Sequence, residues 1–189
     1  MKQYPVEFVP VLLELGARLC SGLEKFNVQY IMCGGTLLGA VREGGLIKHD
    51  YDMDFSVFPN SRKQFFDFVK YTQKHPECGL KVTLGLPVVV KFSPIVPHHI
   101  SKAVGFNRKD VPNPTADVFM LEPRRGGGYK IVGNQWPNGF WKRGEVFPLQ
   151  RLSFSGMMWP APRKPEKMFV RYYGSDWQTP VFYEWPTPH

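Results

Sequence analysis

The 189 residues suit a single domain, because one hydrophobic core usually spans about 100–200 residues. With 43% hydrophobic, 15% aromatic and 21% charged residues, the composition excludes a disordered chain. The formal net charge of +8 favours an anionic partner, such as nucleic acid, a phosphorylated small molecule, an acidic glycan or an anionic lipid. No apolar run reaches the ~18–20 residues that cross a bilayer, so we expect no transmembrane segment.

The N-terminal part of the chain predicts a helix, a strand and a second helix. Apolar residues recur at helical spacing over residues 8–23, and a β-prone run follows at residues 28–33. Gly34 and Gly35 form a turn after this strand, and we interpret Thr36 as the N-cap of the next short helix. Such a turn lets backbone N–H groups approach a phosphate, although an ordinary tight turn has the same sequence pattern.

Residues 50–57 alternate strictly between polar and apolar, which predicts a strand with one apolar and one acidic face. Asp50, Asp52 and Asp54 share the acidic face, with successive side chains about 6.5 Å apart. These carboxylates require water, neutralising Lys or Arg side chains, or a divalent cation. Oxygen ligands of this kind suit Mg²⁺ or Mn²⁺. The alternative interpretation is an exposed edge strand with solvated acids.

The rest of the chain predicts a helix after Ser61, three strands, a loop and a final helix. The strands span residues 80–84, 88–92 and 115–121, the loop 124–144 and the final helix 165–173. This order predicts an α+β fold in one domain over residues 1–189: a small mixed β-sheet flanked by helices, with a loop-rich distal half.

Asp117 stands alone in an apolar strand, where an unpaired buried carboxylate costs several kcal/mol. If its strand lies beside the acidic one, Asp117 reaches the same cation as Asp52 and Asp54; the alternative is a salt bridge to Lys or Arg. We therefore expect these three aspartates to be both the metal ligands and the catalytic residues. A strand, a glycine turn, a short helix and an acidic strand, in that order, are typical of the nucleotidyltransferase fold.

Six stretches between about Val28 and Pro180 also match one known family. They are Gly35–Arg42, Gly45–Ile47, Asp50–Asp54, Asp117–Phe119, Phe147–Gly156 and Tyr173–Trp177. Together they resemble the LicD/fukutin family. His49 and Tyr51 stand where that family usually has a Trp and the middle Asp of an Asp-Asp-Asp run, while Asp52 and Asp54 are present.

The resemblance implies a phosphotransferase that uses Mg²⁺ or Mn²⁺. It moves a phosphocholine-, alditol-phosphate- or sugar-phosphate-like group from a nucleotide diphosphate donor, expected to be CDP-linked, to a hydroxyl of a glycan or glycoprotein. We expect Asp117 also to accept the proton of that hydroxyl. The residues expected to bind the nucleotide phosphates are Gly34, Gly35, Thr36, Arg42 and Lys48; for Arg42, an ion pair with Asp50 is the alternative, and for Lys48, an exposed loop position.

Two other functions remain open. The same metal site suits a nucleotidyltransferase that releases pyrophosphate, and the basic surface suits a non-catalytic module that binds nucleic acid or acidic glycan. The clustered aspartates favour an enzyme, so nucleic acid is not the expected partner. Without a targeting segment in the sequence we expect a cytoplasmic protein, or a Golgi-lumenal one if the chain is an anchor-less fragment of a eukaryotic member.

Overall fold

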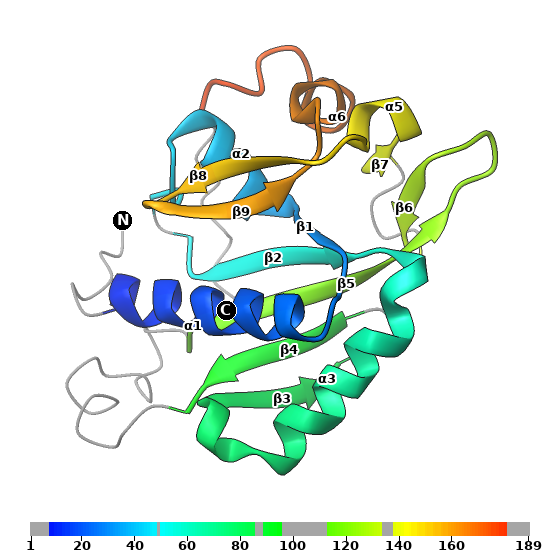
Figure 1. Cartoon of the computed structure of the whole chain (residues 1–189). Coiled ribbons are helices and arrows are strands. Elements are labelled where there is room, and N and C mark those ends of the chain that lie inside the picture. Colours follow the sequence, from blue (N-terminus) through cyan, green and yellow to red (C-terminus); the bar gives the residue numbers. More distant parts are fainter. Residues whose placement is uncertain (1–7, 49, 86–88, 96–112, 134–137, 181–189) are drawn as a thin grey trace, which may run out of the picture.

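A mixed β-sheet forms the centre of the molecule (Figure 1). The computed structural model describes residues 8–48, 50–85, 89–95, 113–133 and 138–180. Along the sheet the strands are β1 (Tyr30–Met32), β2 (Asp52–Val57), β5 (Thr115–Pro123), β4 (Val89–Pro94) and β3 (Leu80–Leu84). Strands β2 and β5 are parallel, whereas the other pairs along this path are antiparallel. The expected α+β fold with a mixed sheet is confirmed.

Helix α1 (Phe8–Lys25) covers one face of this sheet and thereby determines which side chains of β2 face outward. The buried apolar side of α1 packs against β2, β4 and β5, and α3 (Arg62–Lys74) packs beside it against β3. At Gly16 the helix comes so close to β2 that a Cβ atom would lie 2.5 Å from the Sδ of Met53. Because side chains alternate along a strand, Asp52 and Asp54 lie on the opposite face, away from α1.

The expectation of a loop over residues 124–144 is only partly right, because two short strands within this segment extend the sheet; residues 134–137 lie outside the described residues. Strand β6 (Tyr129–Ile131) pairs with the end of β5, and β7 (Phe140–Trp141) pairs with β6. Helix α5 (Arg143–Val146) begins at the end of the same segment. The glycines that suggested a loop include Gly126, Gly127 and Gly128, which have φ angles of 87°, 88° and 92° and make the tight connection from β5 to β6.

A two-stranded hairpin was not predicted from the sequence. Strands β8 (Gln150–Phe154) and β9 (Met157–Ala161) are joined through Ser155 and Gly156, whose φ angles are 49° and 85°. Positive φ at both positions is typical of the tight two-residue turns of hairpins. The hairpin contacts β1 and helix α2 (Gly34–Arg42), and the predicted final helix follows as α6 (Pro165–Tyr173). Two short 3₁₀ helices, η1 (Pro59–Ser61) and η2 (Pro76–Cys78), complete the described elements.

One ion pair fastens α6 to α5 and so orients the end of α6. The guanidinium of Arg171 donates to both carboxylate oxygens of Glu145, at 3.0 and 2.7 Å, and to the carbonyl of Phe140 at 2.7 Å. Glu145 also accepts the N–H of Lys142. Burial raises the pKa of Glu145, but the hydrogen bonds from Arg171 and from the Lys142 N–H outweigh it and hold this pKa below its ordinary value.

We expect Glu145→Gln to lower the free energy of unfolding by about 2 kcal/mol, since it removes one charge of a largely buried pair. A lowered carboxyl pKa stabilises the folded state above the unfolded pKa. The difference between wild type and variant is therefore complete at neutral pH and disappears as the pH falls through the pKa of Glu145. Urea unfolding as a function of pH measures it, with Glu166→Gln on the exposed side of α6 as the control. An equal loss in both variants contradicts this account.

Candidate active site

Carboxylates from two neighbouring strands meet on the face of the sheet opposite α1. The parallel register of β2 and β5 pairs Asp54 directly with Asp117, and Asp52 with Thr115. Neighbouring strands lie about 4.8 Å apart, and residues paired across them point to the same face. The expected proximity of the strands that carry these acids is therefore found. Strand β2 begins at Asp52 and not at Asp50 as expected, so Asp50 lies just before the sheet.

The first turn of helix α2 is bound to Asp54 by three hydrogen bonds. The N–H of Cys33 donates to the Asp54 carbonyl at 3.0 Å, and the N–H of Gly35 donates to Asp54 Oδ2 at 3.0 Å. The N–H of Asp54 in turn donates to Thr36 Oγ1 at 2.7 Å. The interpretation of Thr36 as the N-cap is thus wrong: the helix begins at Gly34, and the buried Thr36 hydroxyl joins the helix to β2.

The glycine pair allows the carboxylates to approach the helix this closely. Gly34 has a φ of +50°, and a Cβ atom on it would collide with the Asp54 carboxylate. A Cβ atom on Gly35 would lie 2.6 Å from Asp50 Oδ2. The N-terminus of a helix carries a partial positive charge, which stabilises nearby anions. In the structure this end of α2 therefore contacts an aspartate, and the binding of phosphate by Gly34, Gly35 and Thr36 stays a prediction.

The acidic cluster is held at an electrostatic cost. Burial raises the pKa of Asp50 to about 7, and repulsion from Asp52 contributes to the rise. Burial also raises the pKa of Asp52, and it raises the pKa of Asp54 well above its ordinary value, where the charges of Asp52 and Asp50 add to the effect. The hydrogen bond from Gly35 lowers the pKa of Asp54 but does not outweigh burial. The surroundings thus do not fully compensate the negative charge that these carboxylates carry when ionised.

Asp117 forms an ion pair with Lys91, a residue that the sequence analysis did not select. Lys91 lies on β4 directly opposite Asp117, and its Nζ lies 2.9 Å from Oδ1 and 2.6 Å from Oδ2 of that residue. The salt bridge that the sequence analysis gave as the alternative for Asp117 is therefore present. A lone lysine between Val90 and Phe92, in a mostly apolar strand, was the sequence signal for it.

Of the two basic residues expected at the phosphates, Arg42 lies away from the glycine turn. Arg42 occupies the last turn of α2, at the opposite end of the helix from Gly34, and its Nη2 pairs with Glu43 Oε1 at 2.6 Å. Arg42 thus pairs with Glu43, whereas the alternative had paired it with Asp50. Lys48 is exposed between α2 and β2, as the loop interpretation expected, and His49 lies outside the described residues.

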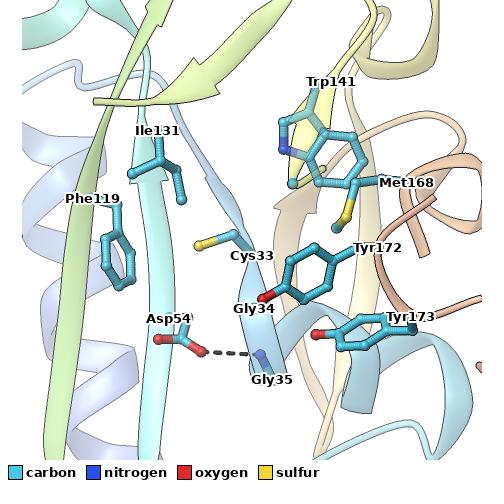
Figure 2. Close-up of a pocket in the computed structure, with 11 residues that line it drawn as sticks. Cys33, Gly34, Gly35, Asp54, Phe119, Ile131, Trp141, Met168, Tyr172 and Tyr173 are labelled. Carbon is cyan, nitrogen blue, oxygen red and sulfur yellow. Dashed lines mark hydrogen bonds between the residues drawn. The ribbon is translucent and has the colours of Figure 1, made fainter. Parts of the chain in front are cut away.

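A pocket of about 210 Å³ lies beside Asp54 (Figure 2). Asp54 and the start of α2 form one side, and the end of α6 forms the facing side. Figure 2 shows the hydroxyl ends of Tyr172 and Tyr173 directed toward Gly34 and Gly35. The pocket is mostly apolar and is lined by Cys33, Gly34, Gly35, Asp54, Phe119, Ile131, Gly139, Trp141, Met168, Tyr172 and Tyr173.

Tyr172 and Tyr173 line the pocket in addition to packing at the end of α6. Tyr173 contacts Phe169 on the same helix, yet both tyrosines stay more than a third exposed and line the pocket. Sequence reasoning missed this role because the helix α6 was placed without knowing which element it faces. Tyrosines that present a ring and a hydroxyl suit a ligand with apolar and polar parts.

The chemistry of the acidic cluster fits a divalent cation. Asp52, Asp54 and Asp117 offer only carboxylate oxygens, project from one face of two adjacent strands and repel one another, which are the conditions that Mg²⁺ or Mn²⁺ relieves. As the side chains stand, no three His, Cys, Asp or Glu residues in the described part of the chain are arranged to share an ion. Both oxygens of Asp117 contact Lys91, and one oxygen of Asp54 contacts Gly35.

The fold has a counterpart among solved structures. The solution structure of the antibiotic-resistance factor ANT(2'')-Ia aligns with 93% of this chain and 76% of its own, at 16% identity and a TM-score of 0.52. The crystal structure of ANT(2'')-Ia in complex with adenylyl-2''-tobramycin covers 80% of this chain and 68% of its own, at 12% identity and a TM-score of 0.47.

Within the described residues, no helix combines the length and apolar character needed to cross a bilayer.

Two sequence comparisons relate the chain to known proteins. The uncharacterized protein RT0683 of Rickettsia typhi (strain ATCC VR-144 / Wilmington) is 24% identical over 151 residues, which make up 80% of this chain and 41% of that protein. The chain thus spans less than half the length of this curated relative. The family model described as LicD/FKTN/FKRP, nucleotidyltransferase domain, matches residues 27–164, which include the acidic strand, the glycine turn and Asp117. The chain therefore belongs to the LicD/FKTN/FKRP nucleotidyltransferase domain family.

Proposed function

We propose that this chain is a metal-dependent transferase that moves a phosphorylated group from a nucleotide diphosphate donor to a hydroxyl of a glycan acceptor. Family membership supports a transferase. The observation that carries the finer proposal is the pairing of Asp54 with Asp117 across β2 and β5, beside the N-terminus of α2 and next to a pocket. Carboxylates, helix amides and a cavity at one point are the parts that phosphoryl transfer requires.

In this proposal Asp52, Asp54 and Asp117 hold Mg²⁺ or Mn²⁺. The bound ion supplies neutralisation of the charge on the donor diphosphate. The first turn of α2 provides backbone N–H groups for the phosphates, and Gly34 keeps that surface free of a Cβ atom. Asp117, as the third carboxylate, accepts the proton of the attacking hydroxyl.

The pocket is the proposed site for the acceptor hydroxyl or for the group attached to the transferred phosphate. It opens directly beside Asp54, and its rings belong to Phe119, Trp141, Tyr172 and Tyr173. Aromatic rings next to hydroxyl groups suit the mixed polar and apolar faces of sugars and alditols. The exposed end of α6 gives this side of the pocket access to a large acceptor.

The reaction products test the proposal. CDP- and GDP-linked alditols, choline and sugars are incubated with the protein, a glycan acceptor and Mn²⁺, and the released nucleotide is identified by chromatography. We expect a nucleoside monophosphate, because attack falls on the distal phosphorus. The release stops with EDTA and falls by a factor of about 10³ in Asp52→Asn. Asp67→Asn, an exposed acid of α3 paired with Lys63, leaves the rate unchanged.

Other products contradict the proposal in distinct ways. Release of pyrophosphate assigns the protein to nucleotidyl transfer instead. Salt-sensitive binding of nucleic acid or acidic glycan, with no turnover and no response to Mn²⁺ or to Asp52→Asn, identifies a binding module.

A further inference from the structure

We propose that Lys91 is an exchangeable cation of the acidic cluster: it leaves Asp117 when a divalent ion binds and then contacts a phosphate of the donor. This inference rests on the proposed function, since it names a further residue that contacts the same substrate. It follows from the position of Lys91, the contacts of its ammonium group and the difference in exposure between the two partners.

Lys91 lies in one row with the acids. The register pairs Lys91 of β4 with Asp117 of β5, and Asp117 with Asp54 of β2, so the three side chains project from the same face of three adjacent strands. Its positive charge also reaches Asp52, where it partly opposes the rise in pKa that burial causes. The pairing of the strands thus places the side chain of Lys91 next to the acidic cluster.

The contacts of Lys91 oppose the binding of a metal ion by Asp117. Its Nζ touches both carboxylate oxygens of Asp117, at 2.9 and 2.6 Å, and so occupies the position that an ion held by both oxygens would take. Mg²⁺ binds carboxylate oxygen at about 2.0–2.1 Å, and a divalent ion at this position would repel the ammonium group strongly. The ion and Lys91 therefore compete for Asp117.

The two partners differ in their freedom to move. The side chain of Asp117 is 12% exposed, whereas that of Lys91 is 46% exposed. A lysine carries its charge on a flexible four-carbon stem, so the ammonium group can swing outward while its backbone stays in β4. The acidic cluster faces the side on which the diphosphate is proposed to bind, and a released ammonium group finds phosphate oxygens there as its new partner.

The affinity for Mn²⁺ alone tests the exchange without any turnover. Free Mn²⁺ is measured by electron paramagnetic resonance during titration of the protein without donor. We expect Lys91→Met to bind Mn²⁺ at least about fivefold more tightly than wild type, because no ion pair has to open first. Lys91→Arg should bind Mn²⁺ more weakly than wild type, since a guanidinium holds a carboxylate through two parallel hydrogen bonds. The arginine variant keeps the charge and so remains informative if the methionine variant does not fold.

The second half of the test measures the phosphate contact, with CDP as the probe and saturating Mn²⁺. Calorimetry should give a CDP affinity about tenfold lower in Lys91→Met than in wild type. The matched control is Lys130→Met. Lys130 of β6 also forms an ion pair across adjacent strands, with Glu122 of β5 at 3.1 Å, but this pair lies outside the acidic cluster. This control should change neither affinity.

The outcomes separate the two proposals. Equal affinities for Mn²⁺ in wild type, Lys91→Met and Lys91→Arg identify a static ion pair and overturn the exchange, while the metal site itself stands. An unchanged affinity for CDP in Lys91→Met overturns the phosphate contact. A wild-type protein that binds no Mn²⁺ refutes the metal site and the exchange together.

Discussion

Asp54→Asn is expected to abolish turnover while the metal-free protein stays folded and becomes at least as stable as wild type. The amide retains an oxygen that accepts the hydrogen bond from Gly35, so the start of α2 keeps its contact with β2. It removes one negative charge from a cluster in which burial and repulsion already raise the pKa of Asp54. We expect the turnover number to fall by about 10³ or more, because a neutral oxygen is a poor ligand for Mg²⁺ or Mn²⁺.

Asp54→Ala separates the two roles of this residue. It also abolishes turnover, but it loses the hydrogen bond from Gly35 and should lower the free energy of unfolding by about 1–2 kcal/mol. Activity assays with Mn²⁺ and urea unfolding in EDTA measure both quantities. Substantial turnover in Asp54→Asn would contradict the role of the Asp54 charge in metal binding. A marked loss of stability of this variant in EDTA would contradict the view that the charge destabilises the metal-free protein.

Gly34→Ala is the second substitution with a large expected effect. Alanine at a φ of +50° costs about 1–2 kcal/mol in backbone energy alone, and its Cβ atom would collide with the Asp54 carboxylate. Either Asp54 or the first turn of α2 must move, and a displacement of about 1 Å in a catalytic site lowers the rate by about 10². Activity and thermal unfolding should therefore both decline.

Gly144→Ala provides the matched control for this substitution. Gly144 lies in α5 and has no positive φ, and a Cβ atom on it would meet nothing within 4 Å beyond its chain neighbours and the backbone of its own helix. We expect full activity and unchanged or slightly higher stability, because alanine favours the helix. Should both glycine variants behave alike, the close approach of Asp54 to α2 has no functional importance.

Local sequence patterns predicted the sheet and the acidic strand. The period-two alternation of residues 50–57 fixed the faces of β2, and the lone Asp117 in an apolar run indicated a strand with a special partner. The start of the strand differed by two residues, because alternation alone does not tell whether Asp50 has a hydrogen-bonded neighbour. The adjacency of Asp54 and Asp117 was an inference from fold type, and the register of β2 and β5 bears it out.

The features that escaped prediction depend on contacts between distant segments. Thr is a residue type that often caps helices, but the Thr36 hydroxyl instead accepts a hydrogen bond from the N–H of Asp54, 18 residues away. Lys91 and Asp117 are separated by 26 residues, and no local sequence pattern predicts that their strands are neighbours. Glycine-rich composition likewise suggested a loop where β6 continues the pairing of β5, because glycines that make a tight turn and glycines that make a long loop look alike in sequence.

The attachment of Asp54 to α2 through its amide, its carbonyl and its carboxylate has a consequence for engineering. These three bonds join the Cys33–Thr36 turn and the middle of β2 into one rigid block. None of these three hydrogen bonds has a partner on α6 or on the aromatic residues across the cavity. We therefore expect that the pocket-facing side chains of α6 can be exchanged while these three bonds are kept.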